Sequence, residues 1–243
     1  MNFNNILFID IETVSQVETY NHLDEDWKEL WDHKARSLIR GSDVETSEDV
    51  YHRAAIYAEF GKIVCISCGC LQGNGEGKKI VIKSYFGHDE KKLLLDFAAM
   101  LQSWSGSPDK FLCAHNGKEF DYPYLCRRMV INGIEIPEIL KISGRKPWEV
   151  RHLDTMELWK FGDYKSFTSL KLLAKVLGIP SPKDDIDGSM VHSVYWVEKD
   201  LERIVLYCQK DVITMAQVLL RFHCEPLIPA PNVEIKTLRK ADV

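Results

Sequence analysis

The sequence predicts an α/β fold in which helices cover both faces of a mixed, five-stranded sheet. Large apolar and β-branched residues fill Ile6–Thr13, a composition typical of a buried strand. Two further strand-like runs, Lys62–Leu71 and Lys79–Phe86, are joined by a glycine-rich segment, which indicates a β-hairpin. Patterns with helical period alternate with the later strand-like runs, so strands and helices are expected to share one layered domain.

A polar and aromatic segment, Val14–Phe60, follows the first strand. Within it Trp27, Trp31 and Ala35 recur at helical spacing, and a second helical piece is expected over Ser47–Ala58. We interpret this segment as a helical insertion that packs beside the sheet.

The remainder of the chain supplies the other elements. Helices are expected over Lys91–Trp104, Tyr124–Ile131, Thr168–Leu177 and Glu198–Phe222, and strands over Phe111–Ala114 and Val150–Leu153. The tail, residues 226–243, is proline-rich without clear periodicity and is expected to be extended. Residues 1–243 would therefore form a single domain.

The composition of the chain limits the classes of protein to which it can belong. The chain has 243 residues, 45% of them hydrophobic and 28% charged, as in an ordinary soluble protein. No signal peptide or membrane-length apolar stretch is present, and the seven cysteines lie mostly in apolar runs, so a cytoplasmic protein with reduced thiols and no membrane partner is expected. A net charge of -5 argues against a protein that coats nucleic acid through a large basic face.

Two carboxylates, Asp10 and Glu12, are spaced two apart in the first strand. Residues at this spacing project from the same face of a strand. Like charges held together at a buried strand favour a divalent cation between them. An edge strand whose polar face meets water would show the same pattern, so the pair alone leaves both interpretations open.

Two further carboxylates occupy suggestive positions. Asp121 follows a strand and a glycine-containing turn, where it could be an active-site group or a helix N-cap. Asp211 lies one helical turn after Tyr207, so both side chains share a helix face. Taken alone, the second pair also fits a half-buried tyrosine beside a solvated aspartate.

Taken together, three motifs appear in order: Asp10-x-Glu12, Asn116-x-x-x-Phe120-Asp121 and Tyr207-x-x-x-Asp211. This pattern resembles the motifs of the DEDD 3′–5′ exonucleases, which have an RNase H-like fold. Leu206 stands where the other branch of that superfamily has histidine, so the third motif is of the Tyr type (DEDDy). The chain most resembles bacterial exonucleases related to the proofreading domain of family B DNA polymerases.

The resemblance implies a two-metal-ion site with Mg²⁺ or Mn²⁺, to which four carboxylates would supply oxygen ligands. By this resemblance Asp10 would bridge both ions, Glu12 and Asp211 would complete the site of the water-activating ion, and Asp121 would hold the second. Tyr207 would orient the attacking water.

Substrate contacts are expected around these motifs. Backbone groups at Ile11 and Thr13 could bind the terminal 3′ hydroxyl, and Asn116 could contact the terminal nucleotide or brace the turn. Phe120 could stack under a base or pack in the core, while Lys118 and Lys165 could contact phosphate or be solvated.

A local basic concentration at residues 127–128 and 141–146 could guide a strand to the site. The expected substrate is the 3′ end of single-stranded nucleic acid, with DNA favoured over RNA. RNA or short oligonucleotides remain alternatives, as does a non-catalytic nucleic-acid-binding module. The chain is too short to include a polymerase, so any proofreading role would need a polymerase or repair partner.

Overall fold

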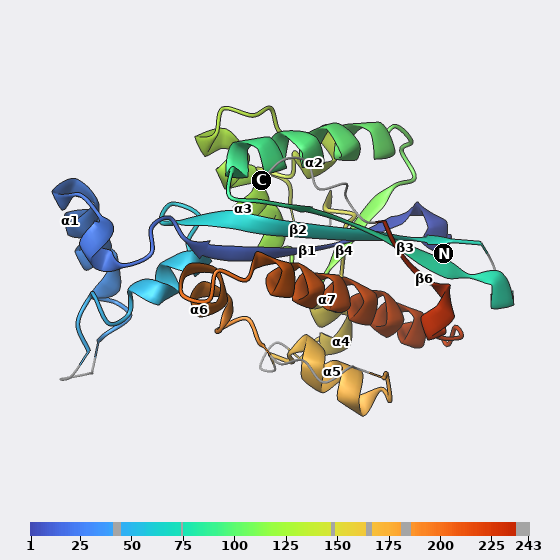
Figure 1. The fold of residues 1–243 in the computed structure, drawn as a ribbon. Helices are drawn as coiled ribbons and strands as arrows, with labels where there is room; N and C mark the ends of the chain where they lie inside the picture. The colour runs from blue at the N-terminus through green and yellow to red at the C-terminus, as the bar shows by residue number, and fades with distance from the viewer. Residues whose placement is uncertain (41–44, 74, 147–148, 164–166, 181–185, 237–243) are drawn as a thin grey trace.

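The protein forms a twisted sheet between two layers of helices (Figure 1). This computed structural model describes residues 1–40, 45–73, 75–146, 149–163, 167–180 and 186–236. The strands are β1 (Ile6–Ser15), β2 (Gly61–Gln72), β3 (Lys79–Phe86), β4 (Phe111–Ala114), β5 (Leu153–Asp154) and β6 (Val233–Lys236). Their spatial order is β5-β4-β1-β2-β3-β6.

Only β2 runs antiparallel to the other five strands. The β1–β2–β3 meander followed by β4 and β5 on the other side of β1 is the arrangement of an RNase H-like sheet. The predicted mixed α/β sheet is confirmed, including the hairpin between β2 and β3. The strand count of five was wrong, because the tail adds β6, which pairs in parallel with β3 at the edge of the sheet.

Seven α-helices complete the described part of the fold. They are α1 (Glu25–Ala35), α2 (Glu90–Trp104), α3 (Asp121–Ile131), α4 (Thr155–Lys160), α5 (Leu170–Val176), α6 (Val191–Trp196) and α7 (Leu201–Phe222). Figure 1 shows α2 and α3 on one face of the sheet and α4 to α7 on the other. Among the described helices, none is both long and apolar enough to cross a membrane.

Helix α7 packs against β1, β2 and β3 with almost every core-facing residue buried. Asp200 begins it by accepting a hydrogen bond from the backbone N–H of Arg203, as an N-cap aspartate should. Helix α7 lies along the same face of the sheet as Asp10 and Glu12, so its side chains lie next to these carboxylates of β1.

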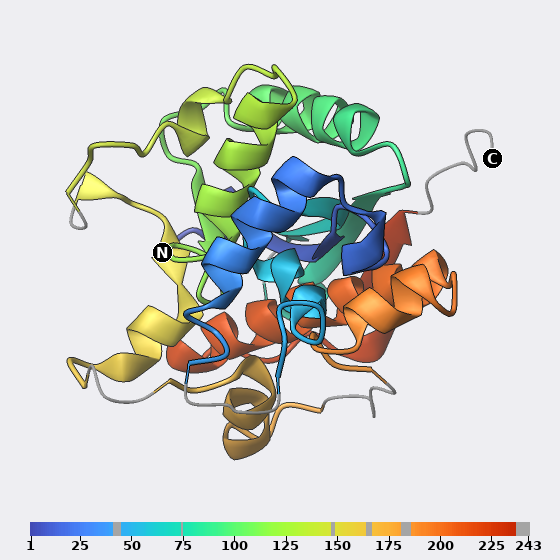
Figure 2. The same cartoon turned by 90° about the vertical axis from the view of Figure 1, so that its left-hand side faces the viewer.

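The insertion after β1 has its own small core, built around the fully buried Trp31. The ring of Trp31 makes edge-to-face contacts with Tyr51 and Phe60, and its indole N–H donates to the backbone oxygen of Ser47 at 2.8 Å. The predicted first helix is confirmed as α1. The second piece is a 3₁₀ helix over Tyr51–Ile56, shorter and tighter than expected. Figure 2 shows α1 in front of the end of the sheet.

Candidate active site

The Asp10 and Glu12 side chains emerge from the same face of β1, as their spacing predicts. One carboxylate oxygen of each and the Cys208 sulfur of α7 all lie within 4.8 Å of one another. The register of β1 against β2 shifts between Glu12 and Thr13, which marks a β-bulge. Bulges commonly re-aim side chains beside active sites, and this one shifts the pairing by one residue where the carboxylates cluster, after which the pairing continues to Ser15.

Asp10 has the surroundings most typical of a metal-binding carboxylate. Its Oδ2 atom is buried and has no hydrogen-bond partner. Burial, followed by the negative charges of Asp211 and Asp121, raises the pKa of Asp10 well above its ordinary value. Burial and the charge of Asp10 similarly raise the pKa of Glu12. Such a cluster is costly to ionise unless a cation joins it.

Asp121 is the first residue of α3 and is almost fully buried. Burial raises the pKa of Asp121 to about 7, although its own backbone N–H and that of Ile11 oppose the shift by interacting with the carboxylate. The N-cap alternative was wrong: Phe120 occupies that position, and Asp121 turns its side chain inward toward β1 instead.

Tyr207 and Asp211 face the same cluster from α7. Burial and then the Asp211 carboxylate, with which the phenol hydrogen-bonds, raise the pKa of Tyr207 far above its ordinary value. The phenol is therefore a hydrogen-bond donor at neutral pH. Asp211 lies outside the compact Asp10–Glu12–Cys208 group, yet its charge acts on both β1 carboxylates.

The turn between β4 and α3 is held from below by Asp154, a buried carboxylate that the sequence analysis missed. Its Oδ1 accepts from the backbone N–H groups of Asn116, Met156 and Glu157 at 2.9, 3.0 and 3.2 Å. Its Oδ2 accepts from the backbone N–H of Lys118 at 3.1 Å. The spacing of Asp154 and Glu157 before an apolar residue is a helix-start signal that could have revealed it.

Glycine is required within this turn. A Cβ atom on Gly117 would lie 2.2 Å from that of Ala114 and 3.4 Å from Asp121 Oδ2. Asn116, just before it, has a left-handed backbone with φ 65°, and its Oδ1 is buried without a partner. His115 is an anchor rather than a metal ligand, since its two nitrogens meet Thr155 Oγ1 and the Thr168 backbone oxygen at 2.9 Å.

The other predicted substrate contacts have different surroundings. Phe120 packs against the main core and Tyr124, which favours the packing alternative. Lys118 forms a 2.6 Å ion pair with Glu157, so its charge is already partly satisfied. Thr13 lies on the bulge and interacts with Tyr124, whereas Lys165 lies outside the described residues.

Cys208 is a second residue that the sequence analysis did not place in the site. Its thiol donates to the Asp10 backbone oxygen at 3.4 Å, so it connects α7 to β1 next to the carboxylates. Burial raises the pKa of Cys208 well above its ordinary value, and the thiol is therefore protonated. Cys208 lies three residues before Asp211 on the same helix face, and this spacing could have indicated that it belongs to the site.

The sheet is RNase H-like, and carboxylates of β1, α3 and α7 interact with one another beside it. A family described as predicted 3′–5′ exonucleases related to the exonuclease domain of PolB matches residues 56–226. The chain belongs to this family, which confirms both the resemblance and the enzyme class expected from the sequence. No curated protein matches the chain.

Several solved structures are similar to this one. The family B DNA polymerase of the hyperthermophilic archaeon Pyrobaculum calidifontis is 18% identical with a TM-score of 0.48, and the match covers 88% of this chain and 24% of the polymerase. The RNase domain of yeast Pop2 is 11% identical with a TM-score of 0.41, covering 95% and 81%. Exonuclease I, with product bound, is 11% identical with a TM-score of 0.35, covering 86% and 45%. Similarity at this level carries no information about the substrate.

Proposed function

We propose that this protein removes nucleotides from the 3′ end of single-stranded nucleic acid, with DNA favoured, by hydrolysing the terminal phosphodiester bond. The observation that carries the proposal is the orphaned Oδ2 of Asp10 within a group of mutually repelling carboxylates. Family membership supports cleavage in the 3′–5′ direction, and the clustered carboxylate oxygens support metal-dependent hydrolysis.

The residues present suit a pair of divalent ions. Carboxylate oxygens are the ligands that Mg²⁺ and Mn²⁺ prefer. Asp10, Glu12, Asp121 and Asp211 would hold the two ions. When bound, such ions neutralise charge on the attacking water and on the leaving oxygen.

The protein side chains contribute orientation. Tyr207 keeps its proton at neutral pH, so its hydroxyl can donate a hydrogen bond and also accept one from a water aligned for attack. Asp211 holds the phenol in place. Asn116, whose amide oxygen is unpartnered, is positioned by Asp154 to receive a donor from the terminal nucleotide.

The test uses matched single strands of DNA and RNA, labelled at either the 3′ or the 5′ end, with Mg²⁺, Mn²⁺ or EDTA. Loss of 3′ nucleotides that requires metal and disappears in Asp10→Ala is the expected result, with DNA degraded faster than RNA. Tyr207→Phe should retain more activity than Asp211→Ala, because it loses orientation but no ligand. Full activity in Asp10→Ala would contradict the mechanism, and a higher rate on RNA would reverse the substrate preference.

A further inference from the structure

One row of the sheet beneath α7 is polar, where a sheet covered by a helix normally has apolar side chains. Ser67 of β2 lies directly opposite Asp10, and Ser84 of β3 lies directly opposite Ser67, so the three residues form a row across the sheet. Side chains that are paired in this way project from the same face. Both serines are at most 2% exposed. Two buried hydroxyls therefore continue the row that begins at the Asp10 carboxylate.

Polar contacts join this row to two consecutive residues of α7. Gln209 Nε2 donates to Ser84 Oγ at 2.9 Å, and the hydroxyl oxygens of Ser84 and Ser67 are 2.8 Å apart. Ser67 Oγ lies 3.7 Å from the Cys65 sulfur, and the Cys65 thiol interacts in turn with that of Cys208. The path leaves α7 at Gln209 and returns to it at Cys208. We call these five side chains the polar ring.

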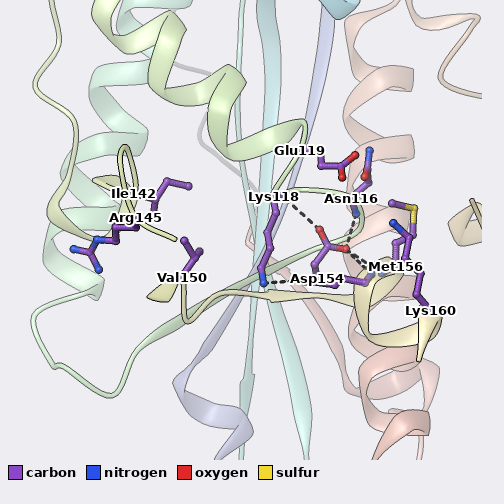
Figure 3. A pocket seen from close by; sticks show the side chains of 10 residues that line it. Asn116, Lys118, Glu119, Ile142, Arg145, Val150, Asp154, Met156 and Lys160 are labelled. Atoms are coloured by element: carbon purple, nitrogen blue, oxygen red, sulfur yellow. Dashed lines mark hydrogen bonds and ion pairs between the residues drawn. The ribbon is translucent and has the colours of Figure 1, made fainter. Parts of the chain in front are cut away.

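The polar ring is closed to solvent, in contrast with the turn that leads to Asp121. That turn borders a pocket of about 370 Å³, which Asn116 and Lys118 help to line (Figure 3). No member of the ring is more than 7% exposed, and all five lie where α7 packs on the sheet. The ring can therefore act only through the groups that it holds in place.

The ring holds the part of α7 that faces the carboxylates. Cys208 and Gln209 lie on the helical turn that begins at Tyr207, and Asp211 follows two residues later. Cys208 also donates to the backbone oxygen of Asp10. Buried polar networks whose members are all satisfied make one arrangement of the elements rigid and unique. The ring thus fixes how far the carboxylate of α7 lies from that of β1.

The second carboxylate of β1 is held in the same way. Cys65 lies directly opposite Glu12, beside the β-bulge, so a member of the ring is paired with this residue too. Mg²⁺ requires near-octahedral geometry with oxygens at about 2.0–2.1 Å, whereas Ca²⁺ accepts about six to eight oxygens at roughly 2.3–2.6 Å in flexible arrangements. A fixed separation between the carboxylates consequently matters more for the binding of Mg²⁺ than for that of Ca²⁺.

We propose that the polar ring fixes the distance between α7 and β1 and thereby makes the carboxylate site selective for Mg²⁺ over Ca²⁺. The inference rests on the proposed function, because it requires the carboxylates of the two elements to share a metal ion. Ser67, Ser84 and Gln209 are positioning residues. They touch neither the metal nor the substrate, and they act by holding Asp211 against Asp10.

The test measures metal binding, which does not depend on hydrolysis. Mg²⁺ and Ca²⁺ would each displace Mn²⁺ from the protein, and free Mn²⁺ would be followed by electron paramagnetic resonance. Ser84→Ala/Gln209→Met replaces both partners of one ring hydrogen bond by apolar groups. In this variant the Kd of Mg²⁺ should rise about 10-fold and that of Ca²⁺ less than about 3-fold. The metal-free Tm should stay close to the wild-type value, because the Ser67 hydroxyl keeps Cys65 as a partner.

Gln217→Met is the matched control. Gln217 is also a glutamine of α7 that is 7% exposed, and it lies eight residues after Gln209. Its side chain accepts from the backbone N–H of Ile228 at 2.9 Å and donates to the Ile228 oxygen at 2.8 Å. Loss of these bonds should lower the Tm, because two buried backbone groups lose their partner. The ratio of the Mg²⁺ and Ca²⁺ dissociation constants should stay at the wild-type value.

Ser67→Ala is a milder second variant, which interrupts the ring between Ser84 and Cys65 with the loss of one oxygen atom. It should shift the ratio in the same direction as the double variant, by a smaller factor. An unchanged ratio in both ring variants, or an equal shift in Gln217→Met, would overturn the inference. So would a wild-type protein that binds Ca²⁺ as tightly as Mg²⁺.

The same proteins separate this inference from the proposed function. If the wild type degrades no oligonucleotide but its preference for Mg²⁺ still depends on Ser84 and Gln209, the proposed function fails and the inference stands. If the wild type removes 3′ nucleotides while the ring variants keep its preference for Mg²⁺, the inference fails and the proposed function stands.

Discussion

Asp10 on β1 and Asp154 on β5 are two aspartates of one sheet, separated by β4, with opposite surroundings. Asp154 accepts hydrogen bonds from four backbone N–H groups, and every donor belongs to the turn or helix that it holds. Asp10 has a buried oxygen that accepts nothing and two acidic neighbours that repel it. A buried carboxylate supplied with N–H donors stabilises a fold, whereas one surrounded by other carboxylates awaits a cation.

The comparison is tested most strongly by Asp10→Asn. Removal of one ligand should lower kcat by about 10³-fold or more, because charge stabilisation in the transition state is lost. The metal-free variant should at the same time unfold at an equal or higher temperature than the wild type, because a repelling charge has been removed. Steady-state kinetics and thermal unfolding in EDTA measure both effects. Marked destabilisation of this variant would mean that Asp10 is a structural carboxylate.

Asp154→Ala should show the opposite balance. It leaves four backbone donors without their acceptor, and we expect a loss of about 3 kcal/mol in the free energy of unfolding. Urea unfolding monitored by circular dichroism measures this loss. Asp154→Asn, which keeps an acceptor oxygen, is the matched control and should recover part of it. An unchanged free energy of unfolding in Asp154→Ala would remove the contrast with Asp10.

Added metal should stabilise the folded protein by binding at Asp10, and it should not bind at Asp154. A ligand that binds the native state at 100 times its Kd stabilises it by about 2.7 kcal/mol. Millimolar Mn²⁺ should therefore raise the Tm of the wild type by several degrees relative to EDTA, and should have little effect on Asp10→Asn. Differential scanning calorimetry of both proteins is the measurement. An equal rise in both would locate the metal elsewhere.

The smallest expected effect concerns His152, which lies two residues before Asp154 in the sequence. The buried imidazole donates from Nε2 to the Ile139 backbone oxygen at 2.8 Å, and burial lowers the pKa of His152. The unfolded chain then binds more protons, so this contribution to stability is complete above about pH 6.5 and is lost as the pH falls. His152→Gln should flatten the pH dependence of the free energy of unfolding between pH 7 and 5. A steeper dependence in the variant would contradict the sign.

The shared faces of the carboxylate-bearing elements could be predicted from the sequence, because that signal is local. Asp10 and Glu12 share a face through strand geometry alone, and Tyr207 and Asp211 through helix geometry alone. The role of Asp154 in holding the turn could not be predicted, because that turn lies almost forty residues away in the sequence. Tertiary pairing also decided β6, since Val233–Lys236 becomes a strand only by docking against β3.

The same docking has a consequence for the solubility of shortened chains. β6 covers the outer edge of β3, and Lys79 forms a 2.7 Å ion pair with Glu234 there. The family match ends at residue 226, before this strand begins. A chain cut at that boundary would keep Asp10, Glu12, Asp121 and Asp211 but expose a row of unpaired N–H and C=O groups along β3. Such a row can pair with the same edge of another molecule, so we expect β6 to protect the chain against aggregation.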